Sequence, residues 1–555
     1  MRPVSAGLLD SGQLTGWGTD GVAVAAAIGG AGLVASLALE RLARPGAAGL
    51  RRPAPALAIH AGLFLAAWSL LWLAGGRPGF AAGLTLALQT LLIAVSNAKY
   101  RALREPFVFS DFGLFSQAFR FPRLYLPFLG AARAAGVVVA AGAASVVGLA
   151  LEPPWPGGRV LALGWLPWGP LLLVLGSRLA AAPRLEPLHD LSAVGLLPSL
   201  WLYWRAEVAT RPSAPPQPWL ERVRPEVGPE LGPGPNPGPN PELGPHPGAR
   251  PAGSCTCDPG PGGLPDLVMV QSESFFDVRR LYPGVRPQIL EQFDRLRREA
   301  LVHGLLEVPA WGANTMRTEF SVLTGIAPEV LGVHRFNPYR RFARGGVLAL
   351  PHRLRDLGYE TVCIHPYPMG FFGRDRIFAG LGFDRFIDIA AFQDAPRQGP
   401  YVADAAVTRK VAEVLGSAVR PAFIFVITME NHGPLHLERV GQDDRARLYL
   451  DPPPQGWDDL TVYLRHLANA DRMFGDLAEL LASRPRGGVL CLFGDHVPTM
   501  PKVYQDLGFA DGRTDYLIWP SRSAPLGRID RAAHALPLVL LDALALVGLP
   551  PGRAC

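Results

Sequence analysis

The sequence predicts a chain of two unlike parts, a multi-span α-helical membrane domain followed by an α/β domain with a mainly parallel central sheet. Three observations support this prediction. The first ~205 of the 555 residues are dominated by Ala, Leu, Gly and Val, whereas residues 265–555 have an ordinary globular composition. In the second part, short apolar runs alternate with amphipathic segments, which is typical of α/β proteins. Polar residues of matching chemistry follow several of the apolar runs.

Five stretches of the first part are apolar enough and long enough to cross a bilayer, which takes about 20 residues. Five such runs packed within the first ~180 residues would leave a soluble protein with too little polar surface. The predicted spans are residues 21–40, 56–75, 79–98, 131–151 and 160–181.

Basic residues follow the first, third and fifth predicted spans. Basic loops tend to stay in the cytoplasm, so these three loops would be cytoplasmic. With five spans, the second part of the chain would then be cytoplasmic as well. Residues 191–204 are short for a span, but a sixth crossing there would export the second part. The alternative is five spans with a cytoplasmic N-terminus and residues 191–204 lying along the membrane interface. The sequence alone does not choose between these arrangements.

A Pro- and Gly-rich segment separates the two parts and includes the near-repeat Gly-Pro-Gly-Pro-Asn-Pro-Gly-Pro-Asn-Pro. Such a composition cannot bury a core and predicts a semi-extended tether. We therefore expect a transmembrane domain at residues 1–205, a linker at 206–264 and a catalytic domain at 265–555.

The second part contains recognisable strands and helices. Residues 286–300 predict a helix with Leu290, Phe293 and Leu296 facing inward, and residues 459–483 predict another with apolar residues at spacings of three, four and seven. Strands are predicted at residues 266–271, 360–365, 423–428 and 488–493.

Candidate site residues follow each of these strands. Glu273 follows the first, His365 the second and His432 the third, and Asp495 and His496 follow the fourth. Ligands of α/β sheets collect at the carboxyl ends of the strands, so four such coincidences are informative.

A hydroxyl group completes the set. Thr315 lies in a polar segment that we expect to form a turn. Together with Glu273, Asp495 and His496 it would offer three oxygens and one nitrogen, which suits Mn²⁺ or Mg²⁺, with Zn²⁺ as a third choice. A metal-bound Thr315 would lose its proton readily and become a nucleophile, so the site predicts metal-assisted phosphoryl transfer.

Cationic side chains would complete such a site. Arg374 can grip a phosphate through its planar fork. His432 and His365 would donate to phosphate oxygens or protonate the leaving group.

In these segments the chain resembles the lipoteichoic acid synthase family of membrane phosphoglycerol transferases. These enzymes are relatives of the periplasmic-glucan phosphoglycerol transferases, within the alkaline phosphatase/sulfatase superfamily. The matching stretches are residues 271–275 (Gln-Ser-Glu-Ser-Phe), 313–320 (Ala-Asn-Thr-Met-Arg-Thr-Glu-Phe), 372–375 (Phe-Gly-Arg-Asp), 430–434 (Glu-Asn-His-Gly-Pro) and 493–496 (Phe-Gly-Asp-His).

The resemblance implies a sulfatase-like catalytic domain outside the cytoplasm, carried by a multi-pass protein of the inner membrane. It also implies that Thr315 is the nucleophile and binds Mn²⁺ with Glu273, Asp495 and His496. Arg374 and His432 match phosphoglycerol-binding positions, and His365 matches one more loosely.

The sequence departs from the family at positions near the substrate. Phe372 stands where Gram-positive members carry Trp, and Tyr367 replaces an acidic residue. These differences concern the donor headgroup and the acceptor rather than the metal ligands.

The leading hypothesis is a two-step transfer of phosphoglycerol from phosphatidylglycerol to a glycan or glycerophosphate acceptor. Phosphoethanolamine transfer to a lipid or glycan is the nearest alternative, and a non-catalytic lipid- or glycan-binding membrane protein is a third.

A transporter is disfavoured because the spans carry almost no charge. The absence of a Cys-x-Pro-x-Arg or Ser-x-Pro-x-Arg motif argues against a formylglycine sulfatase. A net charge of only +6 without a basic stripe argues against a nucleic-acid partner.

Overall fold

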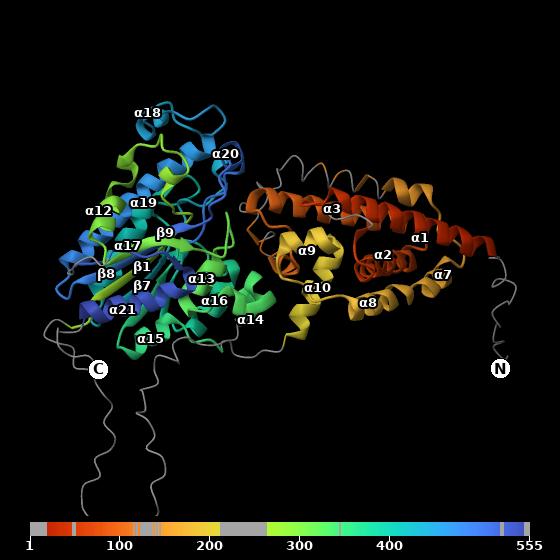
Figure 1. The fold of residues 1–555 in the computed structure, drawn as a ribbon, viewed down its shortest axis with the longest axis horizontal. Helices are drawn as coiled ribbons and strands as arrows, with labels where there is room; N and C mark the ends of the chain where they lie inside the picture. The colour runs from red at the N-terminus through yellow and green to blue at the C-terminus, as the bar shows by residue number, and fades with distance from the viewer. Residues whose placement is uncertain are drawn as a thin grey trace, which may run out of the picture.

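The computed structural model describes residues 19–46, 51–114, 146–210, 263–342, 346–521 and 527–548, and isolated positions between 115 and 145. Figure 1 shows an N-terminal group of helices, in red to yellow, beside a C-terminal domain in which helices surround a sheet, in green to blue. The fold class expected from the sequence is confirmed: apolar helices precede an α/β domain with a mainly parallel sheet.

Among the described residues, four helical stretches are long and apolar enough to cross a membrane. They are Gly21–Leu42 (mostly α1, Thr19–Leu39), Ala54–Gly75 (α2), Pro78–Leu103 (α3) and Gly158–Leu179, which comprises α7 (Gly158–Trp165) and α8 (Trp168–Leu179). The predicted span at residues 131–151 falls largely outside the described residues. Residues 191–204 belong to two short helices, α9 (Pro187–Val194) and α10 (Leu196–Ala209), and neither has the length of a span.

Small residues allow the apolar helices to pack closely. A Cβ added to Gly62 of α2 would lie 2.9 Å from the carbonyl oxygen of Gly169 in α8, and one added to Gly169 would lie 2.7 Å from the main-chain nitrogen of Ala66. Glycine is therefore required at both positions, as is usual where membrane helices approach closely.

A cluster of polar side chains is buried where α1, α2 and α3 meet. Oγ of Ser36 donates to Oε1 of Gln89 at 2.6 Å and lies 2.8 Å from Nε2 of His60. Glu40 pairs with Arg52, and its Oε1 accepts from the main-chain N–H of Leu197 at 2.8 Å. Glu40 and Arg52 thus pair with each other, and Glu40 fastens α10 to the bundle.

The C-terminal domain contains a mixed sheet whose strands follow the order β10-β2-β9-β8-β1-β7-β3-β4, with β11 beside β2. β8, β1, β7, β3 and β4 run parallel, whereas β9 is antiparallel to both of its neighbours. The prediction of a mainly parallel sheet is confirmed. The strands are β1 (Asp266–Ser272), β2 (Val302–Glu307), β3 (Glu360–Ile364), β4 (Arg385–Ile387), β7 (Ala422–Ile427), β8 (Gly488–Gly494), β9 (Thr514–Pro520), β10 (Gly527–Arg528) and β11 (Arg531–Ala532).

The four predicted strands correspond to β1, β3, β7 and β8, each within a residue or two of its expected bounds. The sequence analysis missed β2 and β9. Both lie towards one side of the sheet, where polar residues such as His303 and Asp515 interrupt the apolar pattern. These strands are therefore defined by pairing with β8 and with each other rather than by a local signal.

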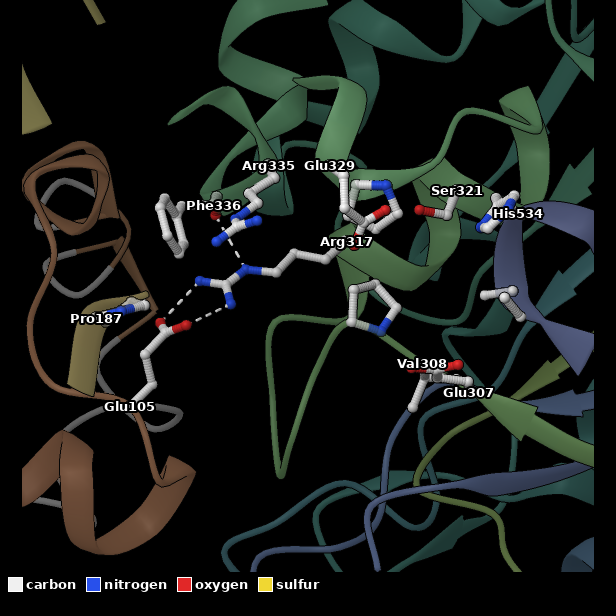
Figure 2. Close-up of a pocket in the computed structure, with 14 residues that line it drawn as sticks. Glu105, Pro187, Glu307, Val308, Arg317, Ser321, Glu329, Arg335, Phe336 and His534 are labelled. Carbon is white, nitrogen blue, oxygen red and sulfur yellow. Dashed lines mark hydrogen bonds and ion pairs between the residues drawn. The ribbon is translucent and has the colours of Figure 1, made fainter. Parts of the chain in front are cut away.

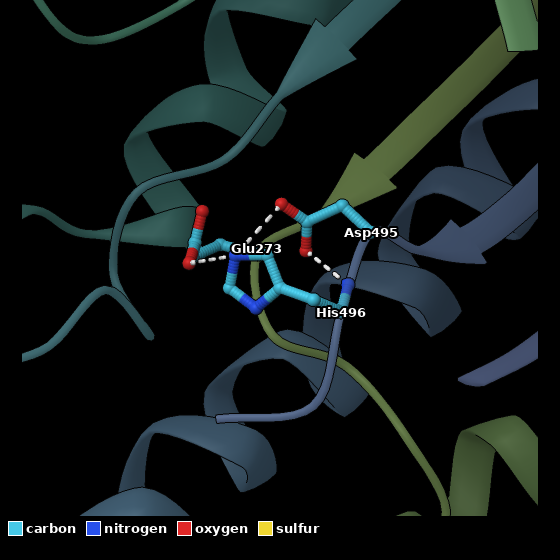
Figure 3. Close-up of side chains that lie close together, drawn as sticks. All are labelled: Glu273, Asp495 and His496. Carbon is cyan, nitrogen blue, oxygen red and sulfur yellow. Dashed lines mark hydrogen bonds and ion pairs between the residues drawn. The ribbon is translucent and has the colours of Figure 1, made fainter. Parts of the chain in front are cut away.

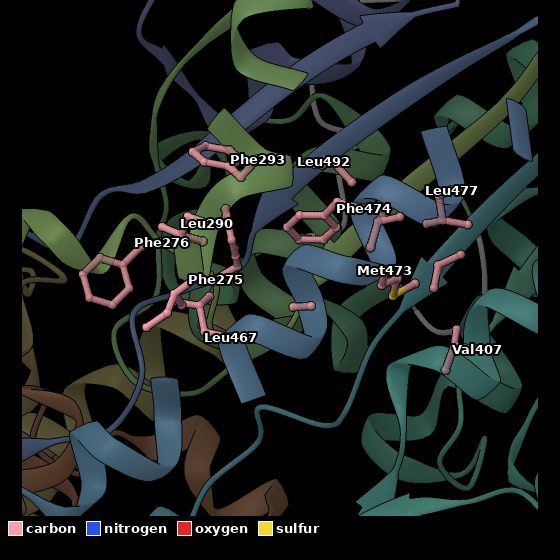
Figure 4. Close-up of a cluster of buried hydrophobic side chains, with 14 of the residues drawn as sticks. Phe275, Phe276, Leu290, Phe293, Val407, Leu467, Met473, Phe474, Leu477 and Leu492 are labelled. Atoms are coloured by element: carbon pink, nitrogen blue, oxygen red, sulfur yellow. The ribbon is translucent and has the colours of Figure 1, made fainter. Parts of the chain in front are cut away.

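Helices cover both faces of the sheet, and the strand residues alternate between the two cores. In β1, Val268 and Val270 pack into one core, whereas Leu267 and Met269 pack into the other. The first core lies under α12 (Glu291–Glu299), α17 (Asp404–Ser417) and α19 (Asp458–Ser483), and Figure 4 shows its aromatic part. The second lies under α13 (Thr315–Thr324), α15 (Leu350–Asp356) and α21 (Leu536–Gly548).

Both predicted helices of this domain are present. α19 spans nearly the predicted range, and its apolar residues at positions 460, 464, 467, 474, 477 and 481 are buried. The helix expected at 286–300 begins with a 3₁₀ turn at Pro287–Leu290 and continues as α12. Leu290, Phe293 and Leu296 are buried, as predicted.

Candidate functional site

The order of the strands gathers the candidate residues at one edge of the sheet. β8, β1, β7 and β3 are consecutive neighbours and parallel, so their carboxyl ends lie side by side. Asp495 and His496 directly follow β8, Glu273 directly follows β1, His365 directly follows β3, and His432 lies in the loop after β7. This is the edge at which α/β sheets place their ligands.

The candidate nucleophile is the first residue of a helix. Thr315 had been expected in a turn, but the turn ends at Asn314 and Thr315 begins α13. Asn314 has a left-handed backbone (φ 66°), a conformation that Asn tolerates better than most residues. One helical turn later, Oγ1 of Thr318 donates to the main-chain oxygen of Asp495 at 2.7 Å, which fastens α13 to the end of β8.

Four ligand atoms converge at this place. Nε2 of His496 lies 3.3 Å from Oδ2 of Asp495 and 3.6 Å from Oε1 of Glu273 (Figure 3). Oγ1 of Thr315 lies 3.4 Å from the same nitrogen. Four ligands held tetrahedrally about 2.0–2.1 Å from one ion are roughly 3.3–3.5 Å apart. The spacing of these atoms therefore fits a shared divalent cation.

The hydrogen bonds around the cluster engage Oδ1 of Asp495 and Nδ1 of His496, and leave Oδ2 and Nε2 to bind a cation. Oδ1 of Asp495 accepts from the main-chain N–H groups of Ser274 and His496, at 2.9 and 3.0 Å. Oδ2 of Asp495 is buried and has no hydrogen-bond partner among the described residues, which is costly for a carboxylate without a cation. The N–H at Nδ1 of His496 donates to the carbonyl of Val497 at 3.0 Å, which leaves the lone pair of Nε2 available.

Electrostatics also favour a cation here. Burial raises the pKa of Glu273 to about 8, and repulsion from Asp495 adds to the effect, whereas His496, Ser274 and Arg374 oppose it. Two buried carboxylates this close resist being ionised together. A divalent cation would remove that penalty, so the charge of the donor set fits a metal as well as its spacing does.

Arg374 is held by an acidic residue that the sequence analysis did not select. Its Nε and Nη2 donate to the two carboxylate oxygens of Glu319 at 2.9 and 2.8 Å, and both side chains are at most 1 % exposed. Its Nη1 donates to Nε2 of His365 at 3.3 Å. The Nε/Nη2 edge of the guanidinium thus faces Glu319. Nη1 and Nη2 each carry a second N–H that these hydrogen bonds do not use. Glu319 lies one turn after Thr315 on α13, and that spacing is the signal that could have found it.

His365 uses both ring nitrogens within the protein. Its Nδ1–H donates to the carbonyl of Ile427 at 3.2 Å, so Nε2 accepts from Arg374. Burial holds the pKa of His365 well below its usual range, and the neighbouring Arg374 adds to this. His365 is therefore neutral and orients the guanidinium.

We expect Glu319→Gln to lower the stability of the C-terminal domain by about 3–5 kcal/mol, because Arg374 would remain buried without its counter-ion. The measurement is the thermal unfolding of the full chain in detergent. The matched control is Glu360→Gln, which breaks a more exposed 2.9 Å ion pair with Arg385 and should cost less than about 1 kcal/mol. Equal melting temperatures for the two variants would contradict this prediction.

Among the hydrogen bonds of the described residues, His432 uses only its Nδ1 nitrogen. Its Nδ1–H donates to the carbonyl of Gly433 at 2.6 Å, and the hydroxyl of Tyr401 donates to the same oxygen at 3.1 Å. Burial lowers the pKa of His432, and Arg374 acts in the same direction, against the hydrogen bond to Gly433 and the charge of Asp495. The imidazole is therefore neutral at neutral pH, and Nε2 can accept a proton.

Aromatic rings border this part of the site. Tyr367 and Phe371 lie 5.2 Å apart between ring centroids, and Tyr401 lies 5.5 Å from His432. Phe372 has a left-handed backbone (φ 56°), which is a strained conformation for a bulky residue. Tyr367 and Phe372 are the positions at which the sequence departs from the family that it resembles.

Ser274 is a second hydroxyl at the centre that the sequence analysis did not assign. Its Oγ donates to Oε1 of Glu273 at 2.9 Å and lies 3.4 Å from Nδ1 of His496. Its backbone is also left-handed (φ 57°). The structure thus brings Glu273, Thr315, Asp495 and His496 together, and adds Ser274.

The Sulfatase family matches residues 265–537. A capsular polysaccharide biosynthesis protein, RkpI, from Rhizobium meliloti (strain 1021) is 36 % identical over 274 residues, or 49 % of this chain and 47 % of that protein. A protein of the same organism named for cyclic beta-1,2-glucan modification is 28 % identical over 283 residues, or 50 % of this chain and 42 % of that protein.

The chain thus spans less than half the length of these two relatives. Among solved structures, the lipoteichoic acid synthase LtaP from Listeria monocytogenes is similar, with 21 % identity and a TM-score of 0.42. The similarity covers 53 % of this chain and 74 % of that one.

Proposed function

We propose that this protein, whose residues 265–537 match the Sulfatase family, is a membrane-bound, metal-dependent transferase that moves phosphoglycerol from a phospholipid to a glycan or glycerophosphate acceptor. The observation that carries the proposal is the cluster around Nε2 of His496, in which three oxygen ligands lie 3.3–3.6 Å from one nitrogen. One of these oxygens is a hydroxyl, which a binding site alone would not require.

Glu273, Thr315, Asp495 and His496 would hold the cation, and we propose Mn²⁺ ahead of Mg²⁺ and Zn²⁺. A bound divalent cation supplies charge that lowers the pKa of the Thr315 hydroxyl and offsets charge on the phosphoryl group. Glu273 and Asp495 contribute two negative charges, so the loaded centre would be close to neutral before the phosphate arrives.

In the first half-reaction, Oγ1 of Thr315 forms a bond to the donor phosphorus, and the bond from phosphorus to the diacylglycerol oxygen breaks. The proton of Thr315 leaves with diacylglycerol, and we assign Nε2 of His432, whose Nδ1–H donates to Gly433, as the group that carries it. In the second half-reaction, an acceptor hydroxyl attacks the phosphorus, the bond from phosphorus to Oγ1 of Thr315 breaks, and the proton of the acceptor passes to Oγ1. The remaining N–H groups of Arg374 would hold the phosphoryl oxygens.

The donor that we propose is phosphatidylglycerol. The apolar helices keep the domain at a membrane, where a lipid donor is concentrated. The proposed glycan acceptor is supported by the names of the two relatives, which refer to a capsular polysaccharide and a cyclic glucan. Phosphoethanolamine transfer would use the same nucleophile and remains the alternative donor chemistry.

The donor can be tested by incubating the full chain with labelled phosphatidylglycerol and Mn²⁺ and mapping adducts by peptide mass spectrometry. We expect phosphoglycerol on Thr315 and release of diacylglycerol. A parallel incubation with phosphatidylethanolamine is the control. An adduct from phosphatidylethanolamine alone would favour the alternative, and no adduct from either lipid would favour a non-catalytic binding protein.

We propose that the catalytic domain, residues 265–555, lies outside the cytoplasm and that residues 191–204 rest on the membrane surface. The ends of α1 and α3 lie together, since the amide of Asn97 donates to the carbonyl of Leu42 at 2.7 Å. The end of α8 reaches the same face, because Gly176 adjoins the carbonyl of Pro55. The catalytic domain contacts this face, and a cytoplasmic N-terminus on the opposite face would place it in the periplasm.

Two of the basic residues on this face pair with acidic side chains. Arg52 pairs with Glu40, and Lys99 pairs with Glu105 and Asp111 at 2.7 and 2.6 Å. Paired charges are weaker signals of membrane orientation than unpaired ones. The proposed orientation, with the catalytic domain outside the cytoplasm, therefore does not follow these two residues.

A further inference from the structure

The membrane part contacts the catalytic domain beside the candidate nucleophile. α3 ends at Leu103; the next residue, Arg104, reaches Trp311 in the segment that leads into α13, and Glu105 reaches Arg317 in the first turn of α13. Arg104 adopts a left-handed backbone (φ 52°), which turns the chain away from the helix axis. These neighbours contact the catalytic domain on the two sides of Thr315.

Glu105 holds the segment after Thr315. Its two carboxylate oxygens accept from Nη1 and Nη2 of Arg317 at 2.8 and 2.9 Å, as Figure 2 shows, and Nε of Arg317 donates to the carbonyl of Phe336 at 3.1 Å. The side chain of Arg317 is 8 % exposed and that of Glu105 is 18 % exposed. A bidentate, partly buried pair of this kind fixes direction as well as distance.

The carboxyl group of Glu105 is held in its ionised form. Burial would raise the pKa of its carboxyl, but the Arg317 and Lys99 cations outweigh burial and hold this pKa well below its ordinary range. Glu105 therefore stays ionised at any pH at which the protein would work, and the pair with Arg317 persists.

Arg104 holds the segment before Thr315. Its guanidinium carbon lies 3.8 Å from the centroid of the Trp311 ring, a cation–π distance, and it also donates to the carbonyl of Phe509. At Gly312 the two halves come so close that an added Cβ would lie 3.2 Å from the carbonyl oxygen of Ala102.

The two contacts enclose a short stretch of strained backbone. Trp311 lies four residues before Thr315 and Arg317 lies two residues after it, and between them Asn314 has a positive φ. A strained turn persists only when its surroundings hold it in place. Within the catalytic domain, Thr499 adds a hydrogen bond to the carbonyl of Gly312 at 2.6 Å.

We infer that Arg104 and Glu105 of the membrane part are positioning residues for Thr315, acting through Trp311 and Arg317. The inference rests on the proposed function for the role of Thr315. It means that the nucleophile is set correctly only while the catalytic domain is seated on the membrane helices. Thr315 would then be oriented for attack on a donor phosphate only at the membrane, where lipid donors are found.

The test compares Glu105→Gln with Glu207→Gln in the full chain. Glu207 also pairs across the two halves, with Arg340 at 3.3 Å, but it lies on α10 and outside the site. We expect Glu105→Gln to slow the formation of the Thr315 adduct from phosphatidylglycerol by about tenfold or more, because small displacements of a nucleophile carry large rate costs. Mn²⁺ affinity should stay within about twofold, and Glu207→Gln should match the wild type.

Amide hydrogen exchange over residues 311–318 gives a second result that needs no substrate. Exchange there should be faster in Glu105→Gln and unchanged in Glu207→Gln, and Glu105→Asp should restore part of the protection. Unchanged exchange in Glu105→Gln, or equal effects of both glutamine variants on exchange or rate, would overturn the inference. A wild-type protein that forms no adduct would instead refute the proposed function, while the exchange data would still decide whether Glu105 orders the segment.

Discussion

Thr315→Ala is expected to abolish adduct formation and to lower phosphoglycerol transfer by about 10⁴-fold or more, as losses of nucleophiles do in other enzymes. In the proposed mechanism the hydroxyl is both a metal ligand and the atom that forms the covalent bond, so no neighbour replaces it. Glu273, Asp495 and His496 remain, so the variant should still bind Mn²⁺, with weaker affinity. The measurements are peptide mass spectrometry after incubation with labelled phosphatidylglycerol, and Mn²⁺ titration of the same preparation.

Two further variants make this result specific. Thr315→Ser keeps the hydroxyl at the start of α13 and should retain much of the activity. Ser274→Ala removes the other hydroxyl of the centre, which donates to Glu273, and should weaken the site without eliminating the adduct. An adduct on Ser274, or full turnover in Thr315→Ala, would show that the nucleophile is misassigned.

Asp495→Asn is expected to lower the affinity for the divalent cation by at least about 100-fold, since even outer partners of metal ligands are worth 10- to 100-fold. Asn would place an NH₂ group where Oδ2 of Asp495 has no hydrogen-bond partner, and would remove a negative charge. Without metal the variant should be as stable as the wild type or more so, because Asp495 no longer repels Glu273. Its amide oxygen can keep the hydrogen bonds from Ser274 and His496.

The measurement is the melting temperature with and without Mn²⁺. At a concentration of 100 times Kd, a ligand stabilises the wild type by about 2.7 kcal/mol, and this gain should disappear in Asp495→Asn. Asp506→Asn is a matched control, because Asp506 is an acidic residue of α20 (Pro501–Leu507) that pairs with Lys502. Equal Mn²⁺ stabilisation of Asp495→Asn and the wild type would remove Asp495 from the proposed ligand set.

The strands that carry the site could be predicted because the signal is local. β1, β3, β7 and β8 are buried on both faces and appear as continuous apolar runs in the sequence. Residues that directly follow such runs lie at the carboxyl edge of the sheet, so Glu273, Asp495 and His496 were found without coordinates. β2 and β9 were missed because their pairing, rather than their composition, makes them strands.

By itself, the sequence determined the two-part organisation, the α/β class and the residues that gather at the sheet edge, because periodicity and composition are properties of neighbouring residues. Only the tertiary structure decided which partner each charged group has. Glu319 forms a bidentate ion pair with Arg374, and Glu105 forms one with Arg317, which lies 212 positions away in the chain. Ion pairs of this kind depend on distance and burial in three dimensions: spacing along the chain can place Glu319 near Thr315, but it does not identify Arg374 as its partner.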